Sequence, residues 1–68
     1  MEIYVHKDYR VITNFRSEYI PRVGEIIHFP HYGGYKVKHV AYRISDTEEP
    51  KELMWVELYV DVLKEDVE

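Results

Sequence analysis

The fold is decided by residues 53–63, which read Leu-Met-Trp-Val-Glu-Leu-Tyr-Val-Asp-Val-Leu. Apolar side chains occupy every even position from Met54 to Val62, and a period of two is typical of a β-strand with one face on a hydrophobic core. The run is rich in β-branched and aromatic residues, which favour a pleated surface. The rival interpretation is a helical seam formed by Leu53, Val56, Val60, Leu63 and Val67. We prefer the strand and leave open a short helical turn within residues 53–67.

The odd positions of this strand would then point away from the core. They are Leu53, Trp55, Glu57, Tyr59, Asp61 and Leu63. Clustered exposed aromatic side chains usually mark an interface. We therefore predict a protein interface made of Leu53, Trp55, Tyr59 and Leu63. The alternative is that an N-terminal segment or the tail covers this ridge.

Four further segments have strand character: residues 2–6, 9–15, 25–29 and 35–44. The first two are expected to pair as a hairpin around Lys7-Asp8, and the third ends at Pro30. Gly33-Gly34 predicts a tight turn before the long strand, because glycine reaches positive φ without steric cost. Alternation in the long strand changes phase near Lys38-His39, which indicates a bulge or a sharp bend.

These four or five strands, with no predicted helix, indicate an all-β fold. Short turns between strands in so short a chain favour a small antiparallel barrel that forms one domain over residues 1–68. The chain lacks cysteine, which excludes disulfides and thiolate metal sites. An efficient aromatic core or a homo-oligomer would then have to supply the stability.

The sequence pattern predicts neither a membrane span nor a signal peptide. No stretch approaches the roughly 20 apolar residues of a membrane span, and the first residues alternate instead of forming a signal peptide. We therefore expect a cytoplasmic protein that does not bind a membrane. The net charge of −4 argues against binding of duplex DNA through its phosphates.

A local basic stretch nevertheless follows the glycine pair. Lys36, Lys38 and Arg43 lie within it without an intervening acid. With Tyr32 and Tyr35 as stacking surfaces, they predict a candidate site for a small anionic ligand such as a cyclic nucleotide. Single-stranded nucleic acid is the further alternative, and an ordinary solvated face is the simplest interpretation.

The histidines and hydroxyls suggest no catalytic chemistry. His28 and His31 would point to opposite sides of a strand, and neither they nor His39 have a flanking carboxylate to complete a metal site. No nucleophile is spaced with a base in a recognisable motif, and Gly33-Gly34 lacks the long loop and helix of a P-loop. We therefore expect no catalytic residues, no metal and no cofactor, and predict that the protein is not an enzyme.

Three segments together resemble a known pattern: residues 20–27 (IPRVGEII), 35–40 (YKVKHV) and 55–58 (WVEL). They resemble short SH3-like barrel proteins of phages and bacterial mobile elements, over about residues 20–60. The resemblance implies an SH3-like antiparallel barrel and a binding module, and it supplies no catalytic residues. We therefore predict a non-enzymatic module, phage or mobile-element encoded, that binds or occludes a host protein or associates with itself.

Overall fold

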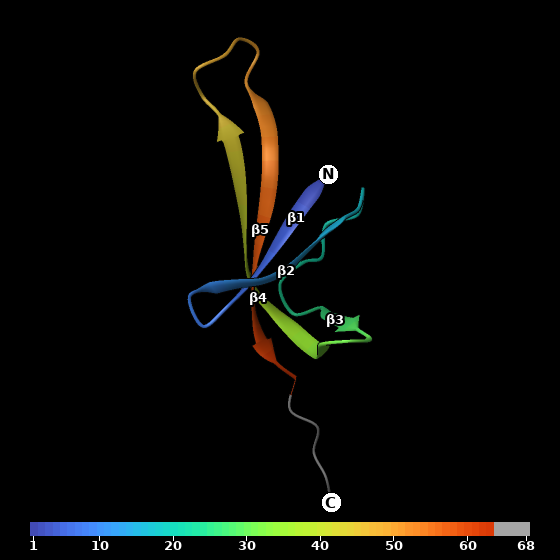
Figure 1. Cartoon of the computed structure of the whole chain (residues 1–68). Helices are drawn as coiled ribbons and strands as arrows, with labels where there is room; N and C mark the ends of the chain where they lie inside the picture. Colours follow the sequence, from blue (N-terminus) through green and yellow to red (C-terminus); the bar gives the residue numbers. More distant parts are fainter. Residues whose placement is uncertain (64–68) are drawn as a thin grey trace, which may run out of the picture.

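Five β-strands and no helix make up residues 1–63, the part of the chain that the computed structural model describes (Figure 1). The strands are β1 (Glu2–Lys7), β2 (Arg10–Arg16), β3 (Ile26–Phe29), β4 (Gly33–Ser45) and β5 (Glu52–Val62). The prediction of an all-β fold with four or five strands is confirmed. The preferred strand over residues 53–62 is also confirmed, so these residues form no helical turn. The remaining part of the helical alternative, residues 64–67, lies outside the described residues. Within 1–63 there is no helix long and apolar enough to cross a membrane.

The strands form one curled sheet in the order β2-β1-β5-β4-β3. The pairs β1–β2, β3–β4 and β4–β5 are antiparallel, but β1 runs parallel to β5. The prediction of a purely antiparallel barrel is therefore wrong, and the sheet is mixed. The physical reason is the adjacency of the first and last strands: Ile3 and Val5 lie opposite Val56 and Leu58, so this pairing joins the most buried apolar residues of both strands.

The curl makes a half-barrel, whose concave side holds the core. Its end strands β2 and β3 are not neighbours in the sheet, yet Phe15 and Phe29 meet with ring centroids 5.8 Å apart. The buried apolar residues are Ile3, Val5, Tyr35, Val37, Val56, Leu58 and Val60. Even positions of β5 thus face the core as predicted. Met54 and Val62 are exceptions: they are about half exposed because they lie beyond the two ends of the core.

The pairing of β4 with β5 is irregular at two places. The first lies between Val37 and His39, which confirms the predicted bulge. The second, between Arg43 and Ile44, was not predicted: Arg43 opposes Trp55, but Ile44 opposes Leu53. Directly opposed residues share a face of a sheet. Leu53 therefore leaves the face of Trp55 and lies on that of Ile44.

Beyond this second irregularity, β4 and β5 project from the other strands as a long hairpin (Figure 1). Four large apolar side chains at the base of this arm or on it are exposed by 36–55%: Tyr42, Ile44, Leu53 and Met54. Tyr42 opposes Val56 and alternation continues along β4, so Tyr42 and Ile44 share the core-side face. The arm thus extends the apolar face of the sheet past the strands that cover the core.

The turn before β4 is displaced from its predicted position. The turn residues are 30–32, and the Tyr32 N–H donates to the Phe29 carbonyl at 3.0 Å. Gly33 follows with φ of +108° and is already the first residue of β4. Gly34 lies inside the strand, where an added Cβ would come within 3.0 Å of the His28 imidazole. The second glycine therefore belongs to the strand and not to the turn.

The predicted N-terminal hairpin is confirmed, and its turn is strained. Lys7 pairs with Arg10, which leaves Asp8 and Tyr9 as a two-residue loop, both with positive φ (54° and 69°). Such loops prefer Asn-Gly or Asp-Gly, because a side chain at positive φ crowds the backbone. Asp8 suits its position, whereas Tyr9 is fully exposed and has no packing to compensate.

We therefore expect Tyr9→Gly to stabilise the protein by about 0.5–1 kcal/mol, the relieved strain minus the added freedom of the unfolded chain. Thermal unfolding followed by circular dichroism would show a rise in Tm of about 4 °C for a domain of this size. Tyr9→Ala is the matched control, because it removes the ring but keeps a Cβ at positive φ. A Tm raised equally by both variants would mean that the ring, and not the backbone, is the source of strain.

Candidate functional site

A buried carboxylate on the outer face of the sheet, the face opposite the core, is the most unusual feature of the molecule. Glu57 lies at an odd position in the middle of β5 and is only 8% exposed. It is the one charged residue among 1–63 that is buried. A charge removed from water is costly unless it is paired and hydrogen-bonded, so its surroundings must compensate it.

Four hydrogen bonds satisfy this carboxylate. Oε1 accepts from the Tyr59 hydroxyl at 2.8 Å and from an Arg43 terminal nitrogen at 3.3 Å. Oε2 accepts from Trp55 Nε1 at 2.9 Å and from Arg43 Nε at 3.1 Å. Arg43 therefore binds both oxygens as a fork, a geometry that its planar guanidinium favours.

These contacts fix the ionisation of the site. The Arg43 guanidinium, followed by the Trp55 and Tyr59 donors, lowers the pKa of Glu57 to about 2. In return, the carboxylate raises the pKa of Arg43 and that of Tyr59. Glu57 is thus ionised at neutral pH and surrounded by donors, an arrangement suited to holding side chains in place and not to moving protons.

The neighbouring strand β1 supplies the other side of the site. Because β1 runs parallel to β5, Tyr4 lies opposite Glu57 and His6 opposite Tyr59. The Tyr4 and Trp55 rings meet edge to face with centroids 6.3 Å apart, and His6 stacks on Tyr59 at 4.7 Å. The Glu57 cluster, as we call it, therefore consists of Tyr4, His6, Arg43, Trp55, Glu57 and Tyr59.

A hollow of about 230 Å³ lies within this cluster on the side of β1. It is lined by Tyr4, His6, Val11, Trp55 and Glu57. His6 Nε2 is buried, has no hydrogen-bond partner and lies 3.6 Å from Glu57 Oε1. The hollow therefore combines two aromatic walls, one ionised carboxylate and one unsatisfied nitrogen.

The predicted interface residues divide between this cluster and other places. Trp55 and Tyr59 both belong to the cluster, where each is half-buried. Leu53 lies on the arm with Ile44, and Leu63 lies at the opposite end of β5, where its N–H donates to the Gly34 carbonyl. β1 lies beside the ridge and covers it in part, as the alternative of an N-terminal cover expected, whereas the interface stays a prediction.

The residues predicted to hold an anionic ligand do not form one group. Tyr35 is buried in the core, and its hydroxyl donates to the Tyr32 carbonyl. Lys36 and Lys38 line a separate hollow, where Lys38 pairs with Asp61 at 3.7 Å. Arg43 is bound to Glu57, so the three cations do not converge on a common point.

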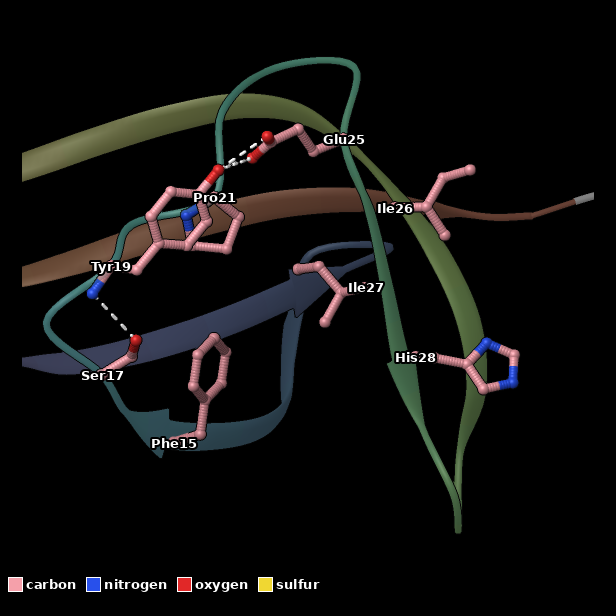
Figure 2. Close-up of a pocket in the computed structure, with 8 residues that line it drawn as sticks. All are labelled: Phe15, Ser17, Tyr19, Pro21, Glu25, Ile26, Ile27 and His28. Carbon is pink, nitrogen blue, oxygen red and sulfur yellow. Dashed lines mark hydrogen bonds between the residues drawn. The ribbon is translucent and has the colours of Figure 1, made fainter.

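A second cleft lies at the open edge of the half-barrel, where Phe15 of β2 and Ile27 of β3 occupy its two sides (Figure 2). The loop that connects β2 and β3 is held by bonds between its own residues: the Tyr19 hydroxyl lies 2.6 and 2.7 Å from the two Glu25 oxygens, to which it donates. The Arg22 N–H donates to Glu25 Oε1 as well, at 2.7 Å. These bonds fix the shape of the loop, and the cleft contains no buried charge comparable to Glu57.

Metal chemistry has no candidate in the described region: among residues 1–63, no three His, Asp or Glu side chains are grouped to hold an ion. Comparisons with protein-family models, with curated proteins and with solved structures found no match to this chain. The Glu57 cluster therefore has to be interpreted from its own chemistry.

Sequence reasoning placed Glu57 on the correct face but gave it no role, and it did not select Tyr4 or His6. The signal that could have found Glu57 is an acid at the centre of an otherwise aromatic and apolar strand, flanked by tryptophan and tyrosine two residues away. No local signal identifies Tyr4 and His6, because their place depends on the pairing of β1 with β5.

Proposed function

We propose that this protein is a non-enzymatic binding module and that it binds a protein partner through the Glu57 cluster. The supporting observation is that one buried carboxylate holds Trp55, Tyr59 and Arg43 in place on the outer face. Tryptophan, tyrosine and arginine are the residues enriched at the energetic centres of protein interfaces.

The rigidity of the cluster is what makes it suited to binding. Immobilising a side chain at an interface costs about 0.5–1.5 kcal/mol, and a side chain already held by hydrogen bonds avoids much of that cost. Trp55 and Tyr59 are each held by a bond to Glu57 and by a ring contact with β1. They keep part of their surface exposed, so a partner has a preformed aromatic surface to cover.

We further propose that the half-barrel is of the SH3-like type. We also propose that the protein is encoded by a phage or mobile element and that its partner is a protein of the host. The bulge in β4 and the five-strand sheet support the first assignment, although the parallel β1–β5 pair departs from the expected antiparallel barrel. The resemblance of residues 20–60 to such proteins supports the second.

Trp55→Ala tests this proposal. Because it removes a central aromatic side chain, we expect it to weaken binding to the purified partner by at least 2 kcal/mol, about 30-fold. The partner is first obtained by affinity capture with the wild type, and both affinities are then measured by isothermal titration calorimetry.

Tyr32→Ala is the matched control, because Tyr32 is an exposed aromatic residue outside the Glu57 cluster. Circular dichroism checks that both variants fold. Equal binding by wild type and Trp55→Ala would overturn the proposal. So would light scattering that shows a wild-type dimer lost in Trp55→Ala, since the partner would then be a second copy of this chain.

A further inference from the structure

The hollow beside Glu57 has the electrostatic character of a cation site. Its two aromatic walls, Tyr4 and Trp55, stand at 80° to each other and form a corner. Glu57 is the only carboxylate in its lining, and no lysine or arginine lines it. Aromatic faces carry negative potential and attract cations, most strongly in the case of tryptophan.

The compensating cation lies on the other side of the carboxylate. Arg43 belongs to β4, whereas Tyr4 and His6 belong to β1, and β5 runs between these two strands. Arg43 is not part of the lining of the hollow. A ligand that enters from the β1 side therefore meets the Tyr4 and Trp55 rings and the carboxylate before it meets the guanidinium.

His6 completes the lining of the hollow beside Glu57. Its Nε2 is buried without a hydrogen-bond partner, although buried polar atoms nearly always have one. The distance of 3.6 Å to Glu57 is too long for a hydrogen bond between the two. Because this nitrogen is shielded from solvent, a ligand in the hollow does not reach it, and a protonated His6 would instead pair with Glu57 at 3.6 Å.

Size restricts the ligand to a small group. Pockets for free small molecules usually measure about 300–1,000 Å³, and this hollow is about 230 Å³. It therefore suits the head group of one side chain. The chain carries a net charge of −4, which favours the approach of a basic partner.

We propose that the hollow formed by Tyr4, Trp55 and Glu57 takes the cationic head group of a lysine or arginine side chain of the partner. This inference rests on the proposed function, because it names the chemistry of the partner at the same site. The cation would lie in the aromatic corner, with the Glu57 carboxylate beneath it.

The test uses Trp55, which is the only tryptophan of the chain and therefore a specific fluorescent reporter. The full chain is titrated with Nα-acetyl-lysine methylamide, its trimethyl-lysine form, the arginine counterpart and the neutral norleucine counterpart. We expect a saturable change in Trp55 fluorescence with the cationic compounds and none with norleucine. The lysine and arginine titrations show which head group fits better.

Tyr4→Leu removes one wall of the hollow and keeps the reporter, so it should weaken cation binding by roughly two- to thirty-fold. Tyr32→Leu is the matched control and should bind as the wild type does. Failure of every cation to change the fluorescence, an equal response to norleucine, or unchanged affinity in folded Tyr4→Leu would each overturn the inference. These titrations use small compounds and do not require the protein partner. The calorimetry with Trp55→Ala therefore tests the proposed function independently of this inference.

Discussion

Replacing Glu57 by glutamine is expected to destabilise the protein by about 2 kcal/mol. The substitution replaces one of the two acceptor oxygens by an NH₂ group, which is a hydrogen-bond donor and faces neighbours that are themselves donors. The Arg43, Trp55 and Tyr59 groups would then compete for the single remaining amide oxygen. Net stabilities are about 0.05–0.15 kcal/mol per residue, so such a loss is a large share of the total for 68 residues. Urea unfolding of both proteins at neutral pH measures it.

Acid unfolding gives a second measure of the same interaction. The pKa of Glu57 is lowered to about 2 in the folded protein from an ordinary value of 4.5. Because the folded state favours the ionised form, the stabilisation is complete above about pH 4.5 and is lost as the pH falls toward 2. The difference in stability between wild type and Glu57→Gln should therefore shrink across this interval.

Glu25→Gln is the matched control for both experiments. Glu25 also accepts hydrogen bonds from a tyrosine, Tyr19, and from a backbone N–H, and its pKa is likewise lowered, chiefly by Tyr19. Glu25 is exposed, however, so water replaces the lost bonds. A loss in Glu57→Gln no larger than that in Glu25→Gln would contradict the view that burial makes Glu57 the organising group of its cluster.

Leu58→Ala is expected to have the largest effect on folding, about 3 kcal/mol, and to leave much of the protein unfolded at 37 °C. Leu58 is fully buried on the central strand and lies opposite Val5 on one side and Val40 on the other. Truncation removes buried methyl groups and leaves a cavity that two paired strands hinder from collapsing.

Thermal and urea unfolding followed by circular dichroism measure this loss. Leu53→Ala is the matched control, since it makes the same substitution on the same strand at a position that is 36% exposed. It should cost much less, because a side chain on the arm has less apolar surface to lose from the core. Similar losses in the two variants would mean that the arm is buried in solution and that Leu53 has a packing partner.

Several elements of the fold can be predicted from local sequence patterns. Val56, Leu58 and Val60 were assigned to the core from the period of two in β5, and the bulge near His39 from the phase change in β4. The turn at Gly33-Gly34 was displaced, because glycine marks a need for positive φ but does not say whether it begins or ends the turn.

Only part of the candidate site can be predicted from the sequence. Trp55 and Tyr59 were selected because tryptophan and tyrosine on an outward face are conspicuous in any sequence. Strict alternation places Leu53 on the same ridge, but the irregularity between Arg43 and Ile44 reverses its face. Such irregularities depend on both strands of a pair, so one strand alone does not reveal them.

By itself, the sequence determined that this chain is a small all-β domain and which side of β5 is buried, because side-chain alternation is a local property of an extended backbone. Only the tertiary structure decided that β1 lies parallel to β5 and that Arg43 of β4 reaches the same carboxylate from the other side. Those two pairings convert Glu57 from one acid on an outward face into the buried centre of an aromatic cluster. Strand order and direction arise from contacts between residues far apart in the chain, and no local period encodes them.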